Sequence, residues 1–143
     1  MFMFKRTVSK LDNQRLLDAV DRARGSWTTY APFLDQFRAE VRRTAPVEPD
    51  DVPGDAITMD SRFALLDLRT DERVYYTLVY PEDESPRDGT VSVLSPMGMA
   101  LLGARVDEEV CWDSADGPQV ARIVELVFQP EAAARAAHRA FNE

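Results

Sequence analysis

Residues 76–103 constrain the fold of this 143-residue chain most, because they carry strand, loop, strand and helix signals without interruption. A β-branched and aromatic run stops at Pro81, which cannot donate to a sheet ladder. After an acidic loop, the alternating segment 90–94 predicts a second strand. Ser95 and Pro96 then provide an N-cap and a first helical position. These signals predict a sheet with one short helix on its face.

Short segments rich in β-branched and aromatic residues predict the other strands. They are residues 56–59, 63–68, 74–80, 110–112 and 120–128, and all strand pairs are expected to be antiparallel. The alanine-rich residues 131–141 predict a terminal helix. The expected core consists of Phe63, Leu65, Val79, Val91, Val93, Leu101, Leu102, Trp112 and Val124. The single cysteine, Cys111, is expected to be an inert thiol in the same core.

The first part of the chain has a different pattern. Residues 9–24 and 32–43 carry apolar side chains at helical spacing, which predicts two helices joined by a short turn. Such a pair is expected to pack antiparallel as a hairpin, with Trp27 and Tyr30 near its turn. Residues 45–55 hold three prolines and four acidic residues, which indicates a linker.

We therefore expect an α+β protein, with a short N-terminal helical hairpin in residues 1–48 and an antiparallel sheet domain in residues 49–143. The first 45 residues carry nine Lys or Arg and five Asp or Glu, whereas the rest carry eight and twenty. This asymmetry suggests two surfaces with different partners, and the acidic larger part argues against a grip on a nucleic-acid backbone. Two ordinary solvated surfaces are the alternative.

The residue types exclude several kinds of chemistry. With one cysteine and one histidine, the chain cannot form an intrachain disulfide, a Cys/His zinc site or a two-histidine metal site. The acidic residues Glu82, Asp83 and Glu84 fall on one loop, and we interpret them as solvated and not as a magnesium site. We expect no catalytic residue, no metal and no cofactor. Because no apolar run approaches about 18 residues, we expect a cytoplasmic protein without membrane contact. We also expect the protein to be a monomer.

Two segments carry a family resemblance. TLVYPED (residues 77–83) and SVLSPMGMALLG (residues 92–103) closely resemble the C-terminal domain of the GreA/GreB transcription elongation factors, in its Rnk-type (regulator of nucleoside diphosphate kinase) form. The order of motifs is kept from about residue 55, through ITMDS, to the segment VFQPEAA. The resemblance implies an FKBP-like fold for the sheet domain.

The resemblance also implies a partner and a contact surface. In Gre factors this domain holds the rim of the RNA polymerase secondary channel through the loop around a Ser-Pro dipeptide, while the helical hairpin enters the channel. The matching positions here are Ser95, Pro96, Met97 and Gly98, and Leu94 stands where Gre factors often carry an acid. At the hairpin turn, Trp27 and Tyr30 would be available to pack against the channel wall.

Cleavage factors of the Gre type present paired acids at the hairpin turn, where these help to hold a second metal ion. Residues 24–33 contain no carboxylate, and the nearest acids, Asp21 and Asp35, lie back along the two helices. The resemblance therefore implies a partner at the secondary channel, and the missing acids at the turn lead us to expect a non-enzymatic modulator that competes with Gre factors there without stimulating transcript cleavage. The alternatives are a transcript-cleavage factor, or an interaction protein that regulates nucleoside diphosphate kinase levels.

Overall fold

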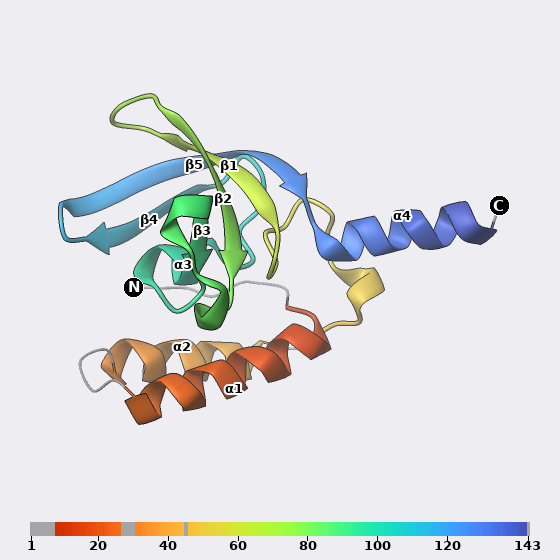
Figure 1. Cartoon of the computed structure of the whole chain (residues 1–143), viewed down its shortest axis with the longest axis horizontal. Helices are drawn as coiled ribbons and strands as arrows, with labels where there is room; N and C mark the ends of the chain where they lie inside the picture. The colour runs from red at the N-terminus through yellow and green to blue at the C-terminus, as the bar shows by residue number, and fades with distance from the viewer. Residues whose placement is uncertain (1–7, 27–30, 45, 143) are drawn as a thin grey trace.

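A helical hairpin and a curled five-stranded sheet make up the fold (Figure 1). The computed structural model describes residues 8–26, 31–44 and 46–142. Helices α1 (Lys10–Ser26) and α2 (Ala31–Arg43) run side by side below the sheet in the view of Figure 1. The predicted α+β class, with N-terminal helices and one sheet, is confirmed. The domain boundary at residue 48 and the FKBP-like character of the sheet stay predictions.

Local capping explains where α1 begins. The Ser9 hydroxyl accepts a hydrogen bond from the backbone N–H of Asp12 over 3.1 Å, as expected for an N-cap. The two helices are then tied together by polar contacts: Asn13 Nδ2 donates to the Val41 carbonyl over 3.1 Å, and Arg38 pairs with Asp21 over 3.1 Å. Both helices extend one or two residues beyond the predicted ends at the turn.

The hairpin packs on the sheet domain and shares its core. The hairpin residues Leu16, Ala19, Val20, Leu34, Phe37 and Val41 are all buried. They belong to one apolar cluster with Ile57, Met59, Phe63, Leu78, Tyr80, Val93, Leu101, Leu102 and Ile123. Two helices alone cannot enclose such a stripe on all sides, so the sheet domain supplies the missing cover. The hairpin therefore packs on the sheet domain as one layer of a single fold.

The sheet has the strand order β3-β2-β1-β5-β4. Its strands are β1 (Arg62–Asp67), β2 (Arg73–Val79), β3 (Thr90–Ser92), β4 (Glu109–Ser114) and β5 (Gly117–Phe128). Three of its pairs are antiparallel as predicted, but β2 and β3 are parallel, with Leu78 opposite Val91. Between them, η2 (Pro81–Asp83) and η3 (Pro86–Asp88) return the chain to the level of Thr77, so that β3 pairs with the second half of β2. This return lets β3 run in the same direction as β2.

The prediction of a strand at residues 56–59 is wrong. Ala56 makes only an isolated bridge with Arg105. Beyond it, the Ser61 hydroxyl accepts the backbone N–H of Thr58 over 2.9 Å, and the Ser61 N–H donates to the Thr58 carbonyl over 3.1 Å. Such hydrogen bonds offer the backbone a turn in place of a sheet ladder.

Seven of the nine predicted core residues are buried, and the other two are half-buried. On β5 the buried side chains are Ala121 and Ile123, so the prediction of Val124 chose the wrong face of the strand. On β4, Trp112 packs against the edge of the apolar cluster. Cys111 is exposed, because alternation on β4 turns it away from the side that Trp112 occupies. The prediction of a buried thiol is therefore wrong.

Two further helices complete the fold. Helix α3 (Pro96–Leu101) covers part of the sheet beside β4, and Gly103 after it has a φ of 79°, a left-handed conformation that glycine often adopts just after a helix. Helix α4 (Pro130–Asn142) points away from the body in Figure 1. None of the described helices combines the length and the apolar character that crossing a membrane requires.

Candidate partner-binding site

The contact segment, defined as residues 95–98, forms the first turn of α3. Ser95 is the N-cap, and its hydroxyl accepts a hydrogen bond from the Gly98 N–H over 3.0 Å. Pro96 stands at the start of the helix, where its missing N–H costs nothing. The structure therefore brings the four predicted residues together in one turn with a fixed shape.

The contact segment lies against the end of β3. The Ser95 hydroxyl donates to the Ser92 carbonyl over 2.7 Å, so it bonds to β3 and to its own helix at once. A Cβ added to Gly98 would lie 1.9 Å from the Ser92 carbonyl oxygen. Any side chain at Gly98 would therefore force α3 away from β3. Within the segment Gly98 is buried, Ser95 and Met97 are half-buried, and Pro96 is exposed.

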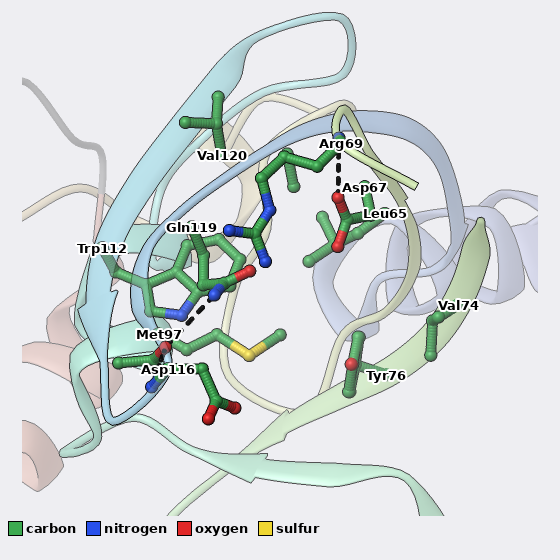
Figure 2. Close-up of a pocket in the computed structure, with 12 residues that line it drawn as sticks. Leu65, Asp67, Arg69, Val74, Tyr76, Met97, Trp112, Asp116, Gln119 and Val120 are labelled. Carbon is green, nitrogen blue, oxygen red and sulfur yellow. Dashed lines mark hydrogen bonds between the residues drawn. The ribbon is translucent and has the colours of Figure 1, made fainter. Parts of the chain in front are cut away.

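A hollow of about 310 Å³ opens beside the contact segment (Figure 2). Met97 belongs to both features. The other lining residues come from the β1–β2 and β4–β5 hairpins and are Leu65, Asp67, Arg69, Val74, Tyr76, Trp112, Ser114, Asp116, Gln119, Val120 and Ala121. The curl of the sheet, which turns these two hairpins toward one another, creates the hollow.

The hollow combines an apolar interior with polar groups. Figure 2 shows the Arg69 side chain extending toward Trp112 and Gln119. The Asp67 carboxylate caps its own turn by accepting the Arg69 N–H over 2.8 Å, and Gln119 Nε2 donates to the Ser114 hydroxyl over 3.2 Å. The lining mixes apolar side chains with five polar or charged ones, and a cleft of this mixed kind can contact both the apolar and the polar parts of a partner's side chain. This chemistry suits recognition.

The side chains around the hollow are apolar, polar and acidic or basic in mixture. Its described lining contains neither a histidine nor a cysteine. Across residues 8–26, 31–44 and 46–142, no group of three or more His, Cys, Asp or Glu is arranged to hold a metal ion.

Trp27 and Tyr30, the predicted contacts at the hairpin turn, lie outside the described residues. The neighbouring ends of α1 and α2 lie at the same end of the molecule as the turn between β4 and β5, at the left of Figure 1. Helix α4 lies at the opposite end.

A buried carboxylate joins the hairpin to the sheet domain. Asp12 on α1 is 8% exposed, and its Oδ1 accepts a hydrogen bond from the Tyr80 hydroxyl over 3.3 Å. Burial raises the pKa of Asp12 to about 6, and the negative charges of Glu131 and Asp60 act in the same direction. The hydrogen bond from Tyr80 and the positive charge of Arg15 lower that pKa without reversing the shift. Burial likewise raises the pKa of Tyr80.

The lining of the hollow is the part of the site that sequence reasoning missed. Trp112 was expected inside the core, yet it is half-buried because it lines the hollow. Strand alternation does place Leu65 and Val74 on one face, since they are partners in the β1–β2 register. The curl that gathers this face into a cleft has no signal in the sequence.

Comparisons with known proteins show the family of the chain. Residues 52–127 match the family model described as "Transcription elongation factor, GreA/GreB, C-term". The chain is 37% identical over 103 residues to a "Regulator of nucleoside diphosphate kinase" from Escherichia coli K12, covering 71% of this chain and 76% of that protein. It is 30% identical over 95 residues to a "Transcription elongation factor GreA" from Syntrophotalea carbinolica, covering 66% of this chain and 60% of that protein.

One solved structure extends the likeness to the whole fold. A "Prokaryotic transcription elongation factor GreA/GreB from Nitrosomonas europaea" superposes with a TM-score of 0.73 at 31% sequence identity. The match covers 87% of this chain and all of that chain, so it includes helices as well as the sheet.

Proposed function

Because this chain belongs to the GreA/GreB family of transcription elongation factors, we propose that it is a non-enzymatic modulator that binds RNA polymerase at the rim of the secondary channel. It competes there with Gre factors and does not stimulate transcript cleavage. The family membership supports the transcriptional role, and the site geometry supports the mode of binding.

The contact segment and the adjacent hollow form the proposed polymerase contact. Pro96 and Met97 present apolar surface from a turn whose hydrogen bonds are already satisfied. A turn fixed before binding loses little conformational entropy when a partner arrives. The hollow beside Met97 then offers room for a protruding side chain of the partner.

One observation carries the proposal of occupancy without cleavage: the hairpin is short and is packed along the sheet domain. Helix α1 has 17 residues and therefore a length of roughly 25 Å. Its apolar stripe lies in the shared core. Such a hairpin can block a channel entrance, but it does not project far beyond the domain that supports it.

The acids nearest the hairpin turn also support a role without cleavage. Asp21 lies five residues before the end of α1, and its carboxylate pairs sideways with Arg38 on α2 over 3.1 Å. A second metal ion would need carboxylates that converge at the turn itself. Residues 24–33 supply none.

A second candidate function rests on the similarity to the regulator of nucleoside diphosphate kinase. In this alternative the chain is an interaction protein that affects the level of that kinase without touching polymerase. It predicts no competition with Gre factors.

A stalled-complex assay tests the proposal. Titrating this protein into backtracked elongation complexes that contain a Gre factor is expected to reduce the Gre-stimulated shortening of RNA. The double variant Pro96→Glu, Met97→Glu is expected to lose this effect. Phe141→Glu is the matched control, since it adds a charge at an apolar side chain that is 89% exposed on α4 at the far end of the molecule. RNA shortening caused by this protein alone would refute the proposal, and an absence of competition would favour the kinase-regulator alternative.

A further inference from the structure

The acidic loop, defined as residues 81–84, is the first part of the connection between β2 and β3, the strand that leads into the contact segment. Its sequence suggests a solvated loop, but its carboxylates make specific contacts. Glu84 Oε2 accepts a hydrogen bond from the backbone N–H of Ser92 over 2.9 Å. Ser92 is the last residue of β3, eight residues further along the chain.

The Glu84 carboxylate gives a hydrogen-bond partner to a backbone amide at the edge of the sheet. Strand β3 lies at the end of the strand order and has β2 as its only neighbour in the described sheet. An amide on the outer side of an edge strand has no ladder partner. The Glu84 carboxylate supplies one for Ser92, and a charged acceptor makes a stronger hydrogen bond than a neutral one.

Ser92 in turn holds the contact segment. Its carbonyl accepts the Ser95 N–H over 3.1 Å and the Ser95 hydroxyl over 2.7 Å. Its own hydroxyl accepts the Leu94 N–H over 3.1 Å. The same carbonyl is the atom that leaves no room for a side chain at Gly98. The position of Ser92 therefore determines the shape of the first turn of α3.

We propose that Glu84 is a positioning residue for the partner contact: its carboxylate fixes Ser92, and Ser92 holds the contact segment in the form that presents Pro96 and Met97. This inference rests on the proposed function. Glu84 does not itself need to touch the partner. Its role is to restrict the conformations of the free segment, so that the segment loses less conformational entropy on binding.

The same loop offers a matched control. Glu82 pairs with Arg22 on α1 over 3.9 Å, and both side chains are largely exposed. An exposed pair at that distance contributes little to stability. Glu82→Ala therefore removes a carboxylate from the acidic loop without disturbing Ser92.

Two measurements on the full chain test the inference. Glu84→Ala is expected to speed hydrogen exchange at the Ser92 and Gly98 amides by about tenfold, because a hydrogen bond to a charged acceptor is lost. The same variant is expected to weaken binding to core RNA polymerase by about tenfold in competition with a Gre factor, with little change in Tm. Glu84→Gln keeps an oxygen acceptor and is expected to restore most of both properties. Glu82→Ala is expected to match the wild type.

The outcomes separate this inference from the proposed function. If the wild type does not bind polymerase, the proposed function is wrong. If the wild type binds and Glu84→Ala binds equally well, the inference is overturned while the function stands. If the Ser92 amide of Glu84→Ala exchanges its hydrogen as slowly as that of the wild type, the inference is overturned as well. A loss of binding that Glu84→Gln fails to restore, together with a large fall in Tm, would show that Glu84 supports the fold and not the contact.

Discussion

The hydroxyl of Tyr80 donates a hydrogen bond to Oδ1 of Asp12 over 3.3 Å, and this contact joins the end of β2 to the first turn of α1. Both residues are buried, so the hairpin and the sheet domain meet at a polar contact inside an apolar cluster. A buried polar pair is favourable only while both groups are satisfied. The junction is therefore sensitive to the charge on Asp12.

We predict that stability falls as the pH rises through the titration of Asp12. Its pKa is raised from 3.8 to about 6 in the folded protein, so between these values the folded state binds more protons than the unfolded state. The stabilising contribution of protonated Asp12 is present below about pH 4 and is lost above about pH 6, a difference on the order of 2 to 3 kcal/mol. Asp60, whose pKa burial also raises, acts in the same direction.

Urea unfolding at pH 5 and pH 7.5 measures this effect by comparing variants. Asp12→Asn is expected to be more stable than the wild type at pH 7.5 and to have a smaller advantage at pH 5. Asp18→Asn is the control, because it changes an exposed carboxylate on the same helix. An equal pH dependence in wild type and Asp12→Asn would show that the Asp12 carboxylate is not buried at the junction.

A second prediction concerns Gly98. The substitution Gly98→Ala places a methyl group 1.9 Å from the Ser92 carbonyl oxygen, which is backbone and cannot simply rotate away. The variant is expected to lose about 1 to 3 kcal/mol or more of unfolding free energy. Gly54→Ala is the matched control, since its added Cβ would meet the end of the Arg135 side chain at an ordinary contact distance of 3.8 Å. Equal melting temperatures for the two variants would contradict the close packing of α3 on β3.

A third prediction tests the packing of α3 itself. Leu101 is completely buried in the shared cluster, so Leu101→Ala is expected to cost about 2 to 5 kcal/mol. Leu11→Ala, on α1 at a side chain that is 57% exposed, is expected to change stability by less than about 0.5 kcal/mol. Thermal unfolding of both variants makes the comparison. An unchanged Tm for Leu101→Ala would mean that α3 is not packed on the sheet.

The features that the sequence predicted well depend on neighbouring residues. The predicted N-cap at Ser95 is an example, because its contact with Gly98 spans only three residues and a local pattern could reveal it. The contact segment was identified in another way, from the resemblance of residues 92–103 to the GreA/GreB factors. Its role in binding a partner stays a prediction.

The features that the sequence missed depend on distant contacts. The parallel pairing of β3 follows from the path of the loop after Tyr80, which no strand pattern encodes. The choice of Ile123 over Val124 for the core depends on the pairing of β5 with β1, whose register shifts at two places. Each shift changes which side chain faces the core. The hollow was missed for a related reason, since it needs the curl of the whole sheet.

The last prediction concerns Trp112 in the hollow. Its indole is half-buried and packs at the edge of the apolar cluster, so it contributes to the fold and to the wall of the hollow together. Trp112→Ala is therefore expected to lower both the Tm and the affinity for core polymerase, whereas Trp112→Phe is expected to keep most of the Tm. If the hollow receives a side chain of the partner, Trp112→Phe should still weaken binding several-fold, because large aromatic residues in central pockets carry much of the energy of an interface.

Competition with a Gre factor measures the affinity, and Val127→Ala serves as the control at an exposed side chain outside the hollow lining. Wild-type affinity in Trp112→Phe and Trp112→Ala alike would exclude the hollow from the contact and leave residues 95–98 as the proposed binding surface.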